Sequence, residues 1–178
     1  MERRVRGSVI NGYMGYVKMK WGKEGLDQCL NGLGLEEGFE DGKYYHAQIS
    51  ENILRWISRE KGDEDLIDVG KYVVKNLGIL KWLVRFADVR TVAEKFPSNY
   101  SEIYTSGHVE IDTGNPDEIL VKLFDVCYIK ETCLSWQGVC EGALEMTKTA
   151  GTVKETKCRV DGDDYCEFTV TLGHGPDT

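Results

Sequence analysis

Proline and long apolar runs are scarce in this sequence, which argues against a linker between domains and against a membrane-spanning helix. Only three prolines occur in 178 residues, and no proline- or serine-rich stretch marks a linker between domains. The longest nearly apolar stretch, LGILKWLVRF at 77–86, is interrupted by lysine and arginine. It falls well short of the roughly 20 residues that cross a bilayer. We therefore expect one domain, residues 1–178, with no membrane partner.

Positive charge is also in short supply. Lysine and arginine number 22 against 30 acidic residues, which gives a formal net charge of -8. A nucleic-acid-binding face needs a basic surface that neutralises phosphates, so no nucleic-acid partner is expected. The first 25 residues mix glycine, asparagine and lysine with apolar residues and lack the apolar core of a signal peptide. These features predict a cytoplasmic location.

The sequence lacks the common catalytic signatures. It contains no glycine-rich phosphate loop, dinucleotide fingerprint, Ser-His-Asp signature or HExxH string. The DGDDY run at 161–165 clusters carboxylates but does not complete a calcium loop, so a solvated turn explains it better. Cys133 with His108 as its base would need a contact that spacing does not show. Enzymatic activity is therefore the weaker hypothesis.

Cysteine, in contrast, is plentiful. Five of the six cysteines lie in the last third of the chain. Because the cytosol keeps thiols reduced, they indicate free thiols or metal ligands, not disulfides. Cys158 and Cys166 stand four residues on either side of Gly162, so in a symmetric hairpin they would face each other and could share a zinc ion. The alternative is an uncharged thiol pair packed in the hairpin.

Further zinc ligands would have to come from elsewhere in the chain. The candidates of suitable type are Cys127, Cys133, Cys140, Glu155, Asp164, His108 and His174. Cys133 and Cys140 would lie roughly 10 Å apart along one helix, so both cannot easily bind one ion.

Apolar spacing predicts the fold class. A period near 3.6 predicts a mainly helical half at 1–97, with helices within 8–34, 50–62, 63–78 and 79–96. In 98–178 a period of two predicts strands within 100–113, 152–160 and 165–172. The run Asn115, Pro116, Glu118 is typical of a helix start. Another helix is predicted at 133–151, where Gly138 and Gly142 would let a second element approach. The expected class is α+β, with N-terminal helices packed with an antiparallel sheet and covering helices.

The run CLSWQGVCEGALEMTKTAGTVKETKCRVDGDDYCEF resembles the signature of the 4-vinyl-reductase (V4R) domain family. The matching residues are Cys133, Gly138, Gly142, Glu155, Cys158, Gly162, Asp163, Cys166 and Phe168. The upstream helices resemble, more weakly, the superfamily of heme nitric-oxide/oxygen-binding domains and vesicle-tethering TRAPP subunits. The resemblance implies a heme-NO-binding/TRAPP-like fold.

The V4R resemblance also implies a structural zinc ion. In the related sensory domains of phenol-responsive bacterial activators, the corresponding Cys, Glu, Cys and Cys hold zinc, which here would be Cys133, Glu155, Cys158 and Cys166. In an unbroken strand Glu155 and Cys158 would point to opposite faces. Shared ligation therefore requires a bulge or bend near Thr156-Lys157. Cys127 and Cys140 depart from the pattern and are expected to be ordinary buried thiols.

Heme is disfavoured by the same comparison. Heme needs an axial ligand, commonly histidine. None of His46, His108 and His174 lies in the 79–96 segment, where heme-binding relatives would carry theirs, and no Tyr-x-Ser-x-Arg motif is present.

The aromatic residues offer either ordinary core or the wall of an apolar pocket. They are Tyr13, Tyr16, Trp21, Trp56, Trp82, Phe86 and Trp136. The V4R family is taken to bind small hydrophobic molecules between helices and sheet, and Trp82 and Phe86, four apart on a predicted helix, are expected to form its wall.

These expectations combine into a hydrophobic-ligand-binding, sensor-type domain with a structural zinc site. A homodimer is expected, because relatives with this type of domain often form homodimers. Two alternatives stay open: an enzyme or accessory protein acting on a vinyl-bearing tetrapyrrole, and a protein-interaction scaffold without a ligand.

Overall fold

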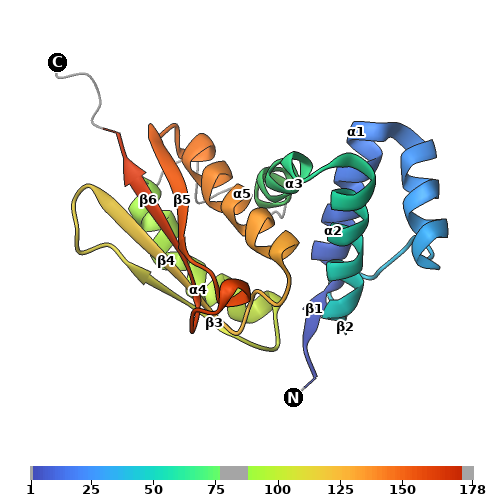
Figure 1. Ribbon diagram of the computed structural model, residues 1–178, viewed down its shortest axis with the longest axis horizontal. Coiled ribbons are helices and arrows are strands. Elements are labelled where there is room, and N and C mark those ends of the chain that lie inside the picture. The colour runs from blue at the N-terminus through green and yellow to red at the C-terminus, as the bar shows by residue number, and fades with distance from the viewer. Residues whose placement is uncertain (1, 77–87, 174–178) are drawn as a thin grey trace.

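The protein consists of a helical part and a part built on a four-stranded sheet (Figure 1). The computed structural model describes residues 2–76 and 88–173. The elements are β1 (Arg4–Arg6), α1 (Gly7–Leu33), β2 (Tyr44–His46), α2 (Ala47–Lys61), α3 (Glu64–Asn76), α4 (Val89–Ile103), β3 (His108–Asp112), β4 (Glu118–Phe124), α5 (Lys130–Thr147), β5 (Gly151–Lys157), the short 3-10 turn η1 (Arg159–Asp161) and β6 (Cys166–Leu172). The larger sheet has the order β3-β4-β6-β5 and is antiparallel throughout, while β1 pairs with β2. The α+β prediction is confirmed.

Local sequence signals explain several helix ends. α1 bends at Gly22 and stops at Gly34, both with positive φ (69° and 63°), a conformation that glycine adopts without a Cβ penalty. α4 starts at Asp88, whose carboxylate accepts hydrogen bonds from the main-chain N–H groups of Arg90 and Thr91.

Two sequence predictions on the sheet side are wrong. α4 runs through Pro97 as far as Ile103, so Tyr100 and Ile103 belong to a helix and not to a strand. Residues three apart share a helix face, and both of these face inward. The predicted helix starting at Asn115 is instead strand β4, whose residues alternate between partly and fully buried. Asn115 Oδ1 accepts from Asp117 N (2.9 Å), so its capping chemistry serves the β3–β4 turn.

Helices α3 and α5 pack with their backbones almost in contact. A Cβ added at Gly70 would lie 1.9 Å from Ser135 O, and one at Gly138 would lie 2.0 Å from Ile67 O. At Gly142 it would lie 2.5 Å from a methyl carbon of Val74. The close approach predicted from the spacing of Gly138 and Gly142 is thus confirmed.

Two large clusters make up most of the apolar interior of the described residues. One is built from α1, α2 and α3, and the other from the sheet with α4 and α5. Tyr104, at the end of α4, packs against both. The helical part and the sheet part therefore meet along a seam in which aromatic residues are prominent.

A polar cluster, here called the Tyr128 clasp, crosses the same seam. The guanidinium carbons of Arg3 and Arg159 lie 3.9 and 4.5 Å from the centre of the Tyr128 ring. Arg3 also pairs with the buried carboxylate of Glu51 on α2, and Arg159 lies 3.4 Å from Asp125. The clasp thus ties the N-terminal segment to η1.

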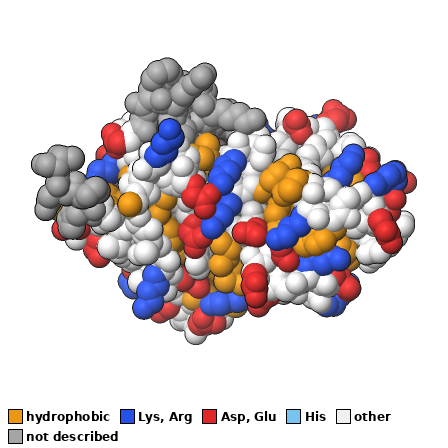
Figure 2. All heavy atoms as spheres, turned by 90° about the horizontal axis from the view of Figure 1, so that it is seen from above, with side chains coloured by type: hydrophobic (Ala, Val, Ile, Leu, Met, Phe, Trp, Pro, Cys, Tyr) orange, Lys and Arg blue, Asp and Glu red, His pale blue; other side chains and the backbone are white. Residues whose placement is uncertain are grey.

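The surface carries mixed charges. Acidic and basic side chains are interspersed with small apolar patches on the face shown in Figure 2. Some of these charges link elements, as where Lys71 of α3 pairs with Glu141 of α5 at 2.8 Å.

Within residues 2–76 and 88–173, no helix combines the length and the apolar character that crossing a bilayer requires.

Candidate metal centre and apolar cavity

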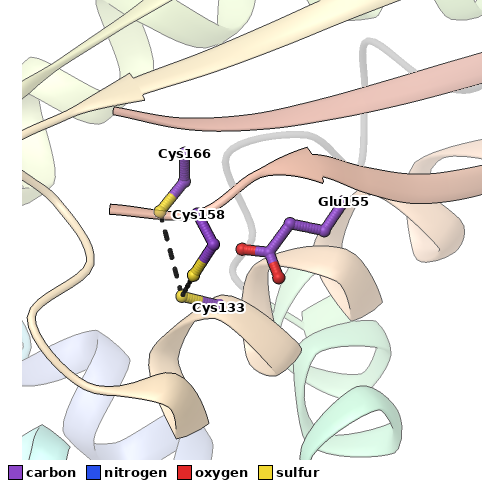
Figure 3. Close-up of side chains that lie close together, drawn as sticks. All are labelled: Cys133, Glu155, Cys158 and Cys166. Atoms are coloured by element: carbon purple, nitrogen blue, oxygen red, sulfur yellow. Dashed lines mark hydrogen bonds between the residues drawn. The ribbon is translucent and has the colours of Figure 1, made fainter. Parts of the chain in front are cut away.

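Four side chains from three elements and one loop converge at the end of the sheet near η1 (Figure 3). Cys133 comes from the first turn of α5, Glu155 from β5, Cys158 from the residue after β5 and Cys166 from the start of β6. One ligand atom from each of the four lies within 4.8 Å of all the others. The four residues that the V4R resemblance implies as ligands are therefore brought together.

The sulfur spacing suits tetrahedral coordination. Cys133 Sγ lies 3.8 Å from Cys158 Sγ and 3.8 Å from Cys166 Sγ. In a tetrahedron with Zn–S bonds of about 2.3 Å, neighbouring sulfur atoms are about 3.8 Å apart. The three cysteines are also buried, which is typical of a structural site.

A bulge brings Glu155 and Cys158 to one side, as the sequence required. The β5–β6 register shifts between Glu155 and Lys157, where the chain gains one residue relative to β6. The symmetric hairpin, however, is wrong: Cys166 pairs with Leu123 of β4, and Cys158 lies beyond the last β5–β6 pair.

The loop after Cys158 curls back on that residue. Cys158 O accepts from the main-chain N–H groups of Asp161 (3.0 Å) and Asp163 (3.1 Å), and Cys158 N–H donates to Asp163 Oδ2 (2.8 Å). The turn closes at Gly162, where φ is 114°. Asp163 thus fixes the loop and is not itself a ligand in the cluster.

A lysine side chain and a main-chain N–H group lie against the cluster. Lys130 Nζ lies 2.8 Å from Asp161 Oδ2 and 3.2 Å from both Glu155 Oε2 and Cys158 Sγ. These contacts, that with Asp161 first, raise the pKa of Lys130 and keep it charged. The main-chain N–H of Arg159 donates to Cys166 Sγ at 3.3 Å.

The thiols differ in their ease of ionisation. Hydrogen bonds from the neighbouring thiols, most strongly the one from Cys127, lower the pKa of Cys166. Hydrogen bonds with Cys127 and then Cys166 raise the pKa of Cys133, and burial raises that of Cys158. The protein thus favours the thiolate form at Cys166 more than at Cys133 or Cys158, and a bound cation would favour it at all three.

One oxygen of the cluster has no partner. Glu155 Oε1 is buried and makes no hydrogen bond among the described residues. Leaving a carboxylate oxygen buried and unpaired is costly, and a metal ion in the cluster would satisfy it. Three sulfur donors and one oxygen form a set that zinc accepts, so the residues present fit this ion.

Of the remaining candidate ligands, Cys127 is buried beside the cluster, where its thiol interacts with Cys133 and Cys166. The other candidates lie elsewhere or are not described. His108 and Asp164 are exposed, with the His108 ring stacked on Phe124 (4.7 Å). Cys140 borders an apolar cavity instead. Trp82 and Phe86, the expected pocket wall, and His174 lie outside the described residues.

An apolar cavity of about 60 Å³ lies between α1, α3, α4 and α5. A second cavity of about 40 Å³ adjoins it, and the two share Val74, Phe96 and Val139. Tyr13 and Trp136, both among the aromatic candidates, line the first cavity. Sequence reasoning missed Asn99, Tyr100 and Tyr104 on its wall; a helical period continued past Pro97 is the signal that would have found them.

Comparison with known proteins gives a match in structure only. No protein-family model matches the sequence, and no curated protein matches it. Among solved structures, an H-NOX protein from S. oneidensis in the Fe(II)NO ligation state has a TM-score of 0.78 at 14% identity, covering 95% of this chain and 99% of that one. An oxygen-binding H-NOX domain related to soluble guanylate cyclases has a TM-score of 0.74 at 13% identity, covering 95% of each chain. A structure from work on heme distortion in the H-NOX family has a TM-score of 0.77 at 12% identity, covering 97% of each.

These matches correct the expectation about heme. Heme is disfavoured in the sequence because 79–96 has no histidine and the Tyr-x-Ser-x-Arg motif is missing. The matching structures are nevertheless H-NOX proteins, described with Fe(II)NO ligation and heme distortion. The expectation that disfavoured heme is therefore wrong. At such low identity the likeness establishes architecture alone: the chain has the fold of the heme nitric-oxide/oxygen-binding (H-NOX) domains.

Proposed function

We propose that the chain is a sensor-type domain that binds a small molecule in the cavity between its helices and is braced by a structural zinc ion. The observation that carries the zinc assignment is the convergence of Cys133, Glu155, Cys158 and Cys166, with an unpaired oxygen on Glu155. The V4R resemblance of the same segment also supports the zinc assignment. The likeness of the fold to H-NOX proteins supports small-molecule sensing.

The charges and the ligand number favour a structural role. Three thiolates and one carboxylate carry four negative charges, against which zinc supplies two positive charges and Lys130 a third. The set is complete with protein ligands and leaves no open position for water or substrate. We therefore assign the metal to stability and not to catalysis.

The zinc site and the cavity are close along α5. Cys133 and Trp136 are three residues apart, so they lie on neighbouring positions of one helix turn. Fixing Cys133 to the sheet through zinc would hold α5, and with it the Trp136 wall of the cavity. The metal would in this way shape the binding site without contacting the ligand.

Heme belongs among the ligands to be tested, because the fold neighbours are H-NOX proteins. Among the described residues, the wall of the first cavity has no histidine; its hydroxyls include that of Tyr13, whose pKa burial raises to about 12. Cys140 in the second cavity likewise has its pKa raised to about 12 by burial. Tyrosine and cysteine side chains hold heme iron in their deprotonated form, so addition of hemin tests these groups directly, and no chemistry is assigned through heme.

Two further proposals come from the V4R resemblance and the composition. We propose a cytoplasmic location, with which the six free cysteines agree. We also propose that the whole chain acts as one domain and forms a homodimer, which sedimentation equilibrium of the purified protein would test.

Metal analysis tests the zinc site directly. Protein purified under reducing conditions should contain one zinc ion per chain by mass spectrometry. Cys158→Ser should lose most of it and melt roughly 10 °C lower or more, because structural zinc contributes folding free energy. Cys29→Ser, which removes a buried thiol from the apolar cluster of α1, α2 and α3, is the matched control and should keep its zinc. Wild-type protein that neither contains nor takes up stoichiometric zinc would refute the assignment.

Ligand binding tests the sensor function. Absorption spectra of the purified protein, before and after addition of hemin, report heme uptake. Thermal-shift measurements with small apolar molecules report the cavity, since a ligand that binds the native state raises the melting temperature. Failure of every ligand to bind would refute the sensor proposal but would not affect the zinc assignment.

A further inference from the structure

Cys127 is a thiol beside the candidate metal cluster that the proposed ligand set does not use. It lies in the loop between β4 and α5, is wholly buried, and belongs to the same apolar cluster as Cys133 and Cys166. Leu123 of β4 pairs with Cys166 of β6, and Cys127 follows Leu123 by four residues, where its thiol interacts with those of Cys133 and Cys166. Cys127 departs from the V4R pattern, so the resemblance gives it no role.

Two of the three cysteine ligands already receive a nitrogen donor from outside the ligand set. Lys130 Nζ lies 3.2 Å from Cys158 Sγ. The main-chain N–H of Arg159 donates to Cys166 Sγ at 3.3 Å. Such donors stabilise the negative charge of a metal-bound thiolate and hold the ligand in its orientation.

Cys133 has no such nitrogen donor among the described residues. Its thiol donates to the main-chain oxygen of Ile129 at 3.7 Å, and its sulfur lies 3.8 Å from the sulfur atoms of Cys158 and Cys166. Ligation of zinc removes the proton from a cysteine, and a carbonyl oxygen cannot then be a partner for the thiolate. With Cys158 and Cys166 also bound as thiolates, the hydrogen available to Cys133 Sγ is that of Cys127.

Cys127 can supply this hydrogen only as a neutral thiol. Tetrahedral zinc takes four ligands, and Cys133, Glu155, Cys158 and Cys166 already form a complete set. If Cys127 were ionised as well, a fifth negative charge would be buried against the two positive charges of zinc and the one of Lys130. Burying an uncompensated charge is costly, whereas the thiol avoids this cost and keeps its S–H group to donate.

We propose that Cys127 is a positioning residue of the zinc site and that its thiol donates an S–H···S hydrogen bond to the zinc-bound thiolate of Cys133. The inference rests on the proposed structural zinc and deepens it by giving the third thiolate its donor. Each cysteine ligand then receives one donor from outside the set, from Lys130, Arg159 or Cys127. Because Cys133 is the ligand on α5, this bond steadies the link between that helix and the sheet.

Cobalt(II) in place of zinc makes the surroundings of the thiolates visible. Thiolate-to-cobalt charge-transfer absorption grows with the number of thiolate ligands, and its wavelength responds to hydrogen bonds that the sulfur atoms accept. The full chain is loaded under reducing conditions with cobalt(II) for absorption spectra and with zinc for competition against a chelator. Cys127→Val, similar in size but without a donor, should keep the intensity of three thiolates, shift the band to longer wavelength and bind zinc about 10-fold more weakly.

Two further variants separate the hydrogen bond from packing. Cys127→Ser keeps a donor at this position and should retain the wild-type band and most of the zinc affinity. Cys140→Val replaces a buried cysteine of α5 that borders the second apolar cavity, and it should leave the band and the affinity unchanged. Circular dichroism of the zinc-loaded variants checks that each one is folded.

The outcomes distinguish this inference from the proposed function. An unchanged band and zinc affinity in Cys127→Val, or a Cys127→Ser protein that is as impaired as Cys127→Val, overturns the hydrogen bond but leaves the zinc site in place. A loss of charge-transfer intensity in Cys127→Val shows that Cys127 is itself a ligand and overturns its positioning role. Wild-type protein that binds neither cobalt nor zinc overturns the zinc assignment and this inference together.

Discussion

The backbone contact between α3 and α5 makes Gly138 the position where one added methyl group should do the most harm. In Gly138→Ala the new Cβ would lie 2.0 Å from Ile67 O, whereas ordinary contacts begin at about 3.4 Å. The helices would have to separate by about 1.4 Å, since the obstructing atoms belong to the main chain and cannot rotate away.

The expected cost follows from two opposing effects. Overpacking a core costs about 1–3 kcal/mol, and a clash with main chain belongs at the upper end of that range. Replacing glycine by alanine within a helix returns about 1 kcal/mol. The net loss should be about 2 kcal/mol or more, which lowers the melting temperature of a chain of this size by roughly 4–8 °C.

Thermal and urea denaturation followed by circular dichroism would measure this loss. Gly32→Ala is the matched control, because its Cβ would meet Trp56 at an ordinary 3.5 Å, and it should be neutral or stabilising by up to about 1 kcal/mol. In Gly70→Ala/Gly138→Ala the second substitution should cost less than it does alone, because the first has already parted the helices. A Gly138→Ala protein that melts at or above wild type would refute the reasoning.

Two further predictions concern the start of α4 and the surroundings of the candidate metal cluster. Hydrogen bonds, most strongly the one from the Thr91 main-chain N–H, hold the pKa of Asp88 below its usual value. The Asp88 carboxylate therefore contributes to folding stability above about pH 4, and this contribution is lost as the pH falls through the pKa of the folded state. Asp88→Asn should keep the cap but flatten this part of the stability–pH profile, and Asp88→Ala should cost about 1 kcal/mol at neutral pH; an Asn variant with the wild-type acid profile would contradict this. Lys130→Met removes the charge 3.2 Å from Cys158 Sγ and should weaken zinc binding about 10- to 100-fold in chelator competition, whereas Lys18→Met, at an exposed position, should not. Unchanged zinc affinity in Lys130→Met would show that the lysine does not support the site.

The periodicity of apolar residues predicted the helices well where the helix face was the only regular pattern. The prediction failed where the helical and the strand periodicity both fit the same residues. Tyr100 and Ile103 suit either element, and Pro97 suggested a helix end, yet packing against α5 and β3 extends α4 to Ile103. At β4 the capping residues near Asn115 outweighed the two-residue alternation of Ile119, Val121 and Leu123, which the sheet in fact buries.

The candidate metal cluster was easier to find than the cavity. Spacing and chemical type are visible in a sequence, so the ligands could be named, and the bulge between Glu155 and Lys157 could be required on geometric grounds. The cavity wall depends on side chains from four helices that meet only in three dimensions. Because α4 was assigned too short, Asn99 had no predicted position from which to face the cavity.

The Tyr128 clasp has a consequence for how the ends of the chain influence each other. Arg3 stands beside β1, and Arg159 belongs to the turn between Cys158 and Cys166, so the Tyr128 ring joins the N-terminal segment to the loop that carries two of the proposed zinc ligands. Coupling between two sites is reciprocal in free energy. A partner that binds or displaces the N-terminal strand should therefore change the zinc affinity. Loss of zinc should change the affinity for that partner by the same factor.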